Sequence, residues 1–204
     1  RLLQTRAGKK YSAEINDVLL TGLALSLQDQ FGISKAKVLM EGHGRELMST
    51  GLDISRTVGW FTSLYPFSLD ISNKKQPALV SVKEALRSIP HKGIGYGILN
   101  YLGDAFSPVN HPSVQFNYLG DFDDTIGSGF YYSSESIGSP VSEENLGTDI
   151  LLDVSGITMS GAMTISIRYS GELFNEATIQ KLTDSYQSYL EKMIGEGEES
   201  KVIL

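Results

Sequence analysis

Residues 37–46 read Lys-Val-Leu-Met-Glu-Gly-His-Gly-Arg-Glu, an apolar run that passes directly into a cluster of charged side chains. The apolar part predicts a short buried strand over 37–40. Glu41 follows this run at once, so partial desolvation would raise its pKa toward the working pH of a general acid or base. The competing interpretation is a glycine-rich surface turn whose charges pair with one another.

Outward from this strand, hydrophobic periodicity predicts a mixed α and β domain. Leucines repeat every four residues over 13–30, which predicts a helix with Ser12 as its N-cap and Gly32 as its stop. Further strands are predicted over 58–65, 67–71, 114–118, 150–154 and 162–169, and further helices over 79–89, 95–102 and 175–193. Pro66 separates the first two of these further strands.

Composition excludes several classes of protein. The 204 residues contain no cysteine, so disulfides, thiol catalysis and thiolate metal sites are impossible. Three scattered histidines argue against a metal centre, and no apolar run approaches the ~20 residues of a membrane span. The net charge is −7, and no lysine or arginine occurs between Gly93 and Ile167, so binding to nucleic acid is not expected.

Three other segments carry unusual patterns, each with an ordinary structural interpretation when taken alone. Residues 90–97 are rich in glycine but lack the spacing of a dinucleotide or phosphate loop. Residues 116–120, Phe-Asn-Tyr-Leu-Gly, end a predicted strand, where Asn117 and Tyr118 could face a polar substrate or simply pack. The aromatic segment around Trp60 is more often core than ligand cage.

Taken together, these segments resemble the nonribosomal peptide synthetase epimerization domains. The motifs that carry the resemblance are Glu41-Gly-His-Gly-Arg-Glu46, Arg56-Thr-Val-Gly-Trp-Phe-Thr62, Pro90-x-Lys92-Gly-x-Gly-Tyr-Gly97 and Phe116-Asn-Tyr-Leu-Gly120. They occur in the family's order, and the resemblance runs from about Tyr11 to Met193. Condensation domains, which form peptide bonds, share the fold and part of the second motif.

The resemblance implies a fold and a boundary. The family has two halves that each resemble chloramphenicol acetyltransferase, and the His-His-x-x-x-Asp motif of the first half is absent here. We therefore expect residues 1–194 to be the C-terminal half, an open α/β sandwich with a mixed sheet and helices mainly on one face. Residues 121–148 are expected to form an arm that crosses to the other half, and residues 195–204 a linker to the next domain.

The resemblance also implies a reaction. The family inverts the Cα of an aminoacyl or peptidyl thioester from L to D in antibiotic biosynthesis. Glu41 matches the family's catalytic glutamate, with Asn117 and Tyr118 orienting the thioester or donating to the enolate. The remaining expected substrate-site residues are His43 and Arg45, which would also orient Glu41, and Trp60 and Tyr96. The chain alone is expected to be inactive, because half of the proton chemistry is missing.

Partners follow from the same resemblance. A peptidyl carrier protein would deliver the substrate on its 4'-phosphopantetheine arm, and no metal or dissociable cofactor would be bound directly. The N-terminal half of the same domain is the second expected partner, and the location is expected to be cytoplasmic. Two alternatives stay open: half of a condensation domain that forms an amide bond, or a non-catalytic docking module.

Overall fold

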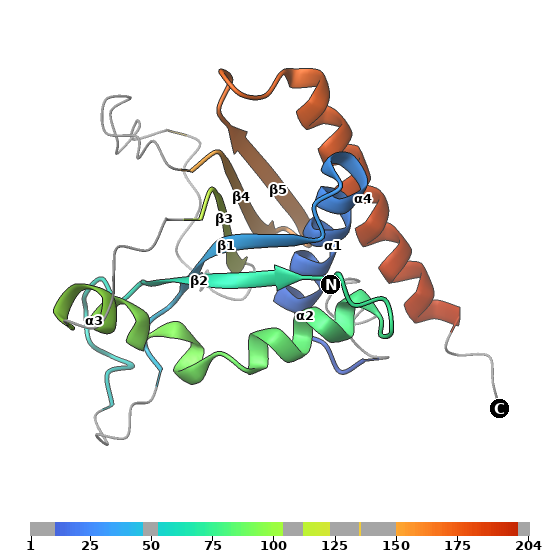
Figure 1. The fold of residues 1–204 in the computed structure, drawn as a ribbon. Helices are drawn as coiled ribbons and strands as arrows, with labels where there is room; N and C mark the ends of the chain where they lie inside the picture. The colour runs from blue at the N-terminus through green and yellow to red at the C-terminus, as the bar shows by residue number, and fades with distance from the viewer. Residues whose placement is uncertain (1–10, 47–52, 104–111, 123–134, 136–149, 200–204) are drawn as a thin grey trace.

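The computed structural model describes residues 11–46, 53–103, 112–122, 135 and 150–199. Their helices and strands are, in chain order, α1 (Ile15–Phe31), β1 (Lys35–Gly42), β2 (Ser63–Asp70), α2 (Ala78–Arg87), η2 (Pro90–Gly93), α3 (Gly95–Leu102), β3 (Val114–Asp121), β4 (Leu152–Met159), β5 (Ala162–Tyr169) and α4 (Glu176–Glu199). The described strands form one five-stranded sheet in the order β2-β1-β3-β4-β5 (Figure 1). The α/β fold with a mixed sheet, predicted from the sequence, is confirmed.

The sheet mixes two kinds of pairing. The central strands β1, β3 and β4 are parallel, whereas β2 and β5 are antiparallel to their neighbours at the two edges. Because parallel strands end at the same side of a sheet, the carboxyl ends of β1 and β3 lie together. Met40 and Phe116 face each other in the register, so the segments that follow them lie at the same end of the sheet.

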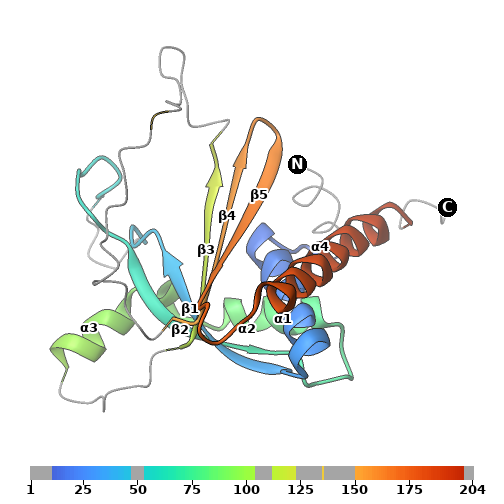
Figure 2. The same cartoon turned by 90° about the horizontal axis from the view of Figure 1, so that it is seen from above.

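One face of the sheet is apolar and covered by helices, and the other carries a mixture of polar and apolar side chains. Alternate residues of every strand supply the covered face, among them Phe67, Val38, Phe116, Val154 and Ile167. Helices α1, α2 and α4 gather on one side of the sheet, whereas α3 lies apart, at the end of the sheet where β2 begins (Figures 1 and 2). The intervening residues of β1, β3 and β4 form an open face.

Helices α1 and α4 pack side by side at the centre of the core (Figure 2). Gly22 allows the close approach, because a Cβ at this position would lie 2.8 Å from the ring of Tyr186. The Tyr186 hydroxyl donates a hydrogen bond of 3.0 Å to the carbonyl of Leu19, and burial raises the pKa of this tyrosine. A polar group is thus satisfied inside the interface between the two helices.

Two local predictions are wrong. The N-cap of α1 is Glu14 rather than Ser12, because Glu14 and Asp17 form a reciprocal capping box in which the Glu14 N–H donates to the Asp17 carboxylate at 2.7 Å. Residues 63–70 form one strand rather than two strands broken at Pro66. Pro66 is tolerated inside β2 because this strand lies at the edge of the sheet and needs no second row of hydrogen bonds.

The ends of the predicted arm and linker also differ from the sequence analysis. Strand β3 continues to Asp121, so this residue belongs to the sheet, and the N–H of Phe122 just beyond it donates to the carbonyl of Thr158 on β4. The rest of the arm, apart from residue 135, lies outside the described residues. Helix α4 extends through Glu199, into the segment predicted as a linker; whether this segment joins another domain stays a prediction.

Within the described residues, each helix is too short or too polar to cross a lipid bilayer.

We expect Tyr186→Phe to lower the free energy of unfolding by about 0.5–1.5 kcal/mol, because the change removes one buried hydrogen bond and leaves the ring in place. Urea denaturation of the chain measures this loss. Tyr189→Phe is the matched control, since Tyr189 lies on the same helix and its hydroxyl has no hydrogen-bond partner in the described part of the chain. Equal effects of the two changes would contradict the assignment.

Candidate active site

Glu41 lies at the end of β1 on the open face of the sheet, with its carboxylate half-buried. Its two oxygens accept hydrogen bonds from amide groups on the neighbouring strand β3: Gln115 Nε2 donates to Oε1 at 2.7 Å, and Asn117 Nδ2 donates to Oε2 at 2.6 Å. The two donors are two residues apart on β3, so strand alternation puts both on the face of Glu41. The carboxylate is thereby fixed in position.

Burial raises the pKa of Glu41 above the usual range of a glutamate. The hydrogen bond from Gln115 acts in the opposite direction and lowers the pKa, the negative charge of Asp153 raises it, and the hydrogen bond from Asn117 lowers it. The net direction is upward. A raised pKa makes the carboxylate a stronger proton acceptor than an ordinary glutamate, which suits acid–base catalysis.

The glycine-rich loop after β1 packs against the segment that leads into β2. Gly44 has φ +65°, and a Cβ there would lie 1.5 Å from the carbonyl oxygen of Phe61, so only glycine fits. Arg45 crosses the same segment: its Nη1 donates to the carbonyl of Ile54 at 2.6 Å, and its guanidinium lies 4.1 Å from the centre of the Phe61 ring. The first and second motifs of the sequence therefore meet in space.

The third motif joins the same assembly through Glu46. The Glu46 carboxylate accepts from His43 Nε2 at 2.9 Å and lies 3.5 Å from Lys92 Nζ. Gly93, with φ +83°, packs its Cα against the Tyr65 ring, where a Cβ would lie 2.2 Å from the nearest ring atoms. The segment 90–93 is thus held to the loop at 42–46 by charge and to β2 by close packing.

A cleft of about 670 Å³ opens at this end of the sheet. Glu41 and Asn117 line it together with Tyr118 and His43. The start of α1 and the end of α2 also line it, including Asp17 and Arg87, which form a 3.3 Å ion pair. The apolar side chains in the lining include Met40 from β1 and Leu86 and Ile89 from the region of α2. A cleft of this volume is within the usual range for small-molecule sites.

The structure separates some of the predicted site residues from Glu41. Tyr118 follows Asn117 and points to the covered face, where its hydroxyl lies 2.9 Å from the Thr158 hydroxyl. His43 and Arg45 were expected to orient Glu41, but the contacts above occupy both side chains elsewhere. Among the described residues, the side chains that hold the Glu41 carboxylate are Gln115 and Asn117.

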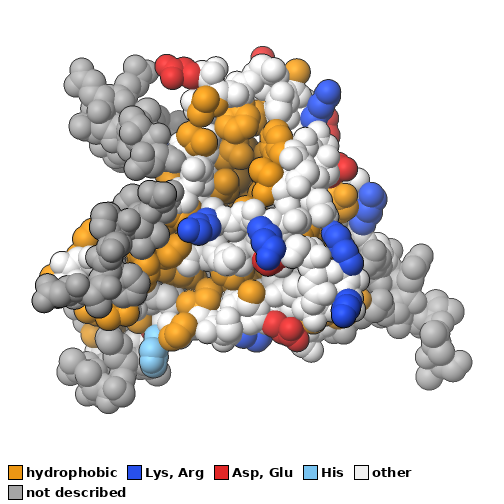
Figure 3. Space-filling model, viewed as in Figure 1, with side chains coloured by type: hydrophobic (Ala, Val, Ile, Leu, Met, Phe, Trp, Pro, Cys, Tyr) orange, Lys and Arg blue, Asp and Glu red, His pale blue; other side chains and the backbone are white. Residues whose placement is uncertain are grey.

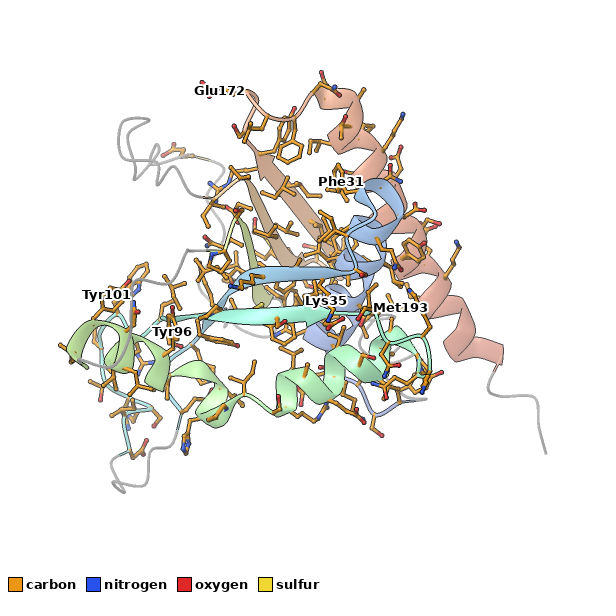
Figure 4. The ribbon with its side chains drawn as sticks, in the orientation of Figure 1. Phe31, Lys35, Tyr96, Tyr101, Glu172 and Met193 are labelled. Atoms are coloured by element: carbon orange, nitrogen blue, oxygen red, sulfur yellow. The ribbon has the colours of Figure 1, made fainter. Side chains whose placement is uncertain are left out.

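Trp60 and Tyr96 lie outside the residues that line the cleft. Trp60 is 91% exposed. Tyr96 lies on the side of α3 toward the strands, whereas Tyr101 lies at the outer end of this helix (Figure 4). Hydrophobic side chains gather around α3 at the surface (Figure 3), among them Ile98, Leu99, Tyr101 and Leu102.

Sequence reasoning missed Gln115, although a signal for it was present. It stands two positions before Asn117 in a predicted strand, and strand alternation puts both side chains on one face. The described residues contain no cluster of three histidine, aspartate or glutamate side chains that could hold a metal ion. The arrangement therefore offers a positioned carboxyl group with a raised pKa beside an open cleft.

We expect Gly44→Ala to cost more free energy of unfolding than Gly32→Ala. Both glycines have a left-handed backbone, φ +65° and +68°, but a Cβ at Gly32 meets no atom within 4 Å. The control therefore measures the left-handed backbone penalty of ~1–2 kcal/mol alone. Urea denaturation of both variants gives the difference. Equal costs would show that the loop does not pack on Phe61 as described.

We expect Glu41→Gln to gain stability relative to the wild type as the pH rises. The pKa of Glu41 is raised in the folded chain above its unfolded value of 4.5, so ionisation of this group opposes folding. This penalty grows in the wild type as the pH rises above 4.5, and the glutamine variant lacks it. The Tm of Glu41→Gln minus the Tm of the wild type should therefore increase between about pH 3 and pH 7.5. A difference that stays constant with pH would contradict the raised pKa.

Comparison with known proteins gives the chain a family. The family model described as "Condensation domain" matches residues 2–202. Bacitracin synthase 1 of Bacillus licheniformis is 38% identical over 199 residues, which cover 94% of this chain and 4% of that protein. Surfactin synthase subunit 1 of Bacillus subtilis (strain 168) is 40% identical over 202 residues, which cover 94% of this chain and 6% of that protein.

Solved structures of domains from such synthetases have a similar fold. The crystal structure of the epimerization domain from the third module of tyrocidine synthetase B is similar with a TM-score of 0.86 and 35% identity, over 98% of this chain and 46% of that chain. The first condensation domain of the CDA synthetase, with a TM-score of 0.55 and 15% identity over 95% of this chain and 41% of that chain, shares the fold alone. The chain spans less than half of the solved epimerization domain and under a tenth of the two synthases. It belongs to the condensation domain family.

Proposed function

We propose that this chain is the C-terminal half of a nonribosomal peptide synthetase epimerization domain, and that Glu41 exchanges a proton with the Cα of a carrier-bound aminoacyl or peptidyl thioester. The observation that carries the proposal is the half-buried Glu41 carboxylate, held by two amide donors where the cleft opens. The 35% identity to a solved epimerization domain, against 15% to a condensation domain, supports the epimerizing branch.

The chemistry requires a group of this kind. A thioester acidifies its α-proton because the carbanion left behind delocalises into an enolate. Removal of the proton breaks the Cα–H bond, leaves the electron pair in the enolate, and places the proton on the base. Delivery of a proton to the opposite face of Cα then gives the inverted centre. A carboxyl group with a raised pKa can take part in either direction, as the base or as the acid.

Inversion needs an acid–base group on each face of Cα. This chain supplies Glu41 on one side, and none of the described helices covers the face of the sheet beside it, where a second wall could dock. The second group would come from the other half of the domain, which in the resembling family carries the His-His-x-x-x-Asp motif. The chain alone is therefore expected to lack the complete reaction.

The substrate would arrive on the phosphopantetheine arm of a peptidyl carrier protein. The cleft of about 670 Å³ is large enough for the thioester end of the substrate, and Met40, Leu86 and Ile89 give it an apolar wall. Asn117 already donates to Glu41, so it would fix the carboxylate before the substrate enters. Tyr118 lines the same cleft, and its role there stays a prediction, as do those of His43, Arg45, Trp60 and Tyr96, and the cytoplasmic location.

We expect Glu41→Gln, made in the complete parent domain, to slow inversion of a carrier-bound L-aminoacyl thioester at least ~10²-fold, the usual contribution of a general acid–base group. Chiral analysis of the released product and uptake of deuterium at Cα from D₂O measure the loss. Glu172→Gln is the matched control, because Glu172 is exposed at the end of the molecule away from α3 (Figure 4).

The same assay separates the competing functions. Formation of D-product without a second substrate supports an epimerase. Retention of the L-centre, with amide formation once a second carrier-bound substrate is added, would instead indicate a condensation domain. Undiminished inversion by Glu41→Gln would remove Glu41 from the mechanism and leave the site as a structural turn.

A further inference from the structure

A row of side chains crosses the open face of the sheet beside Glu41. The strand registers align Leu39 with Gln115, Gln115 with Asp153, and Asp153 with Arg168. Four strands contribute one residue each, and all four side chains point away from the helices because they alternate with buried residues. The row ends in the Asp153–Arg168 ion pair at one side, and its second member, Gln115, donates to Glu41 near the other.

Two direct contacts involve members of this row: Arg168 with Asp153, and Gln115 with Glu41. Arg168 binds the Asp153 carboxylate through Nε at 3.0 Å and Nη2 at 2.5 Å. Gln115, which faces Asp153 across the β3–β4 pairing, donates to Glu41 at 2.7 Å. The Asp153 side chain is 17% exposed and the Arg168 side chain is 77% exposed, so the anion is largely shielded from water and its cationic partner is not.

We propose that Asp153 and Arg168 act together as positioning residues that set how tightly Glu41 holds its proton, with Arg168 attenuating the effect of Asp153. This inference rests on the proposed function of Glu41 as an acid–base group. Neither residue belongs to a motif by which the sequence resembles its family. Their assignment comes from the registers of β3, β4 and β5.

The direction of the effect follows from charge. Asp153 lies two strands across from Glu41 and is offset by two residues along the strands, a separation on the order of 10 Å that is comparable with the Debye length at physiological salt. A largely shielded anion at this distance disfavours a second negative charge on Glu41, and its charge raises the pKa of Glu41 in addition to the effect of burial. The positive charge of Arg168 offsets part of the electric field of Asp153. Because the arginine side chain is exposed, water screens its charge and the offset is incomplete.

Other charged groups surround Glu41, and most of them are paired with one another. Those of the described residues are Lys37 on β1, His43 and Glu46 in the loop that follows, Lys92 in η2, Glu14 and Asp17 at the start of α1, and Arg87 on α2. Asp17 pairs with Arg87, and Glu46 pairs with His43 and Lys92. The cross-strand pair thus adds a separate influence from the open face.

The test is the pH dependence of Cα proton exchange in the complete parent domain, measured as deuterium uptake from D₂O by a carrier-bound thioester. We expect Asp153→Asn to shift the acidic limb of the profile to lower pH by part of a pH unit. Arg168→Met should shift it to higher pH, because it leaves the Asp153 charge unneutralised. Arg168→Lys keeps the positive charge and should restore most of the wild-type profile.

Controls separate this inference from a purely structural role and from the proposed function. Asp184→Asn, an Asp→Asn change at a position on α4, should leave the profile unchanged. The inference would be overturned if Asp153→Asn and Arg168→Met lowered the exchange rate at every pH but left the acidic limb of the profile in place. That result would indicate a purely structural pair. If Glu41→Gln keeps full exchange, the proposed function fails instead. If Glu41→Gln abolishes exchange while the profiles of Asp153→Asn and Arg168→Met keep the acidic limb of the wild type, only the present inference fails.

Discussion

The parallel pairing of β1 with β3 is the constraint on which the site depends. It brings the Glu41 carboxylate against the side-chain amides of Gln115 and Asn117, which are 74 and 76 residues away in the chain. A half-buried carboxylate without donors would be costly, because burial disfavours its charged form. Two amide donors satisfy the oxygens without supplying a compensating charge, so the carboxylate is held in place while its pKa stays raised.

This arrangement keeps the pKa of Glu41 raised at a cost in stability. A salt bridge to an arginine or lysine would stabilise the ionised glutamate more strongly, but it would also hold the pKa low and weaken the group as a proton carrier. The cations of the cleft, Arg87 and Lys92, are paired with Asp17 and Glu46. Functional sites often hold groups in environments that lower folding stability, and a partly desolvated carboxylate is typical of them.

The glycine-rich motifs have a packing role that explains their composition. Gly44 and Gly93 both adopt left-handed backbones, and each meets an atom of the segment from Phe61 to Tyr65 where a side chain would otherwise lie. The glycines allow two loops to approach β2 closely, and Glu46 then links the loops through His43 and Lys92. The charged residues of the first motif, other than Glu41, thus chiefly build the frame in which Glu41 is presented.

The sequence alone determined most of the element types, because hydrophobic periodicity reports which side of a helix or strand is buried. It also offered Glu41 as a candidate, from the apolar run before it and from the family resemblance. It could not show that Pro66 lies inside a strand, since only the sheet order makes β2 an edge. It also could not show that Gln115 holds Glu41, or that Asp153 and Arg168 lie on the same face of the sheet as Glu41. These facts depend on strand register, which is set by contacts between residues far apart in the chain, and no local pattern encodes it.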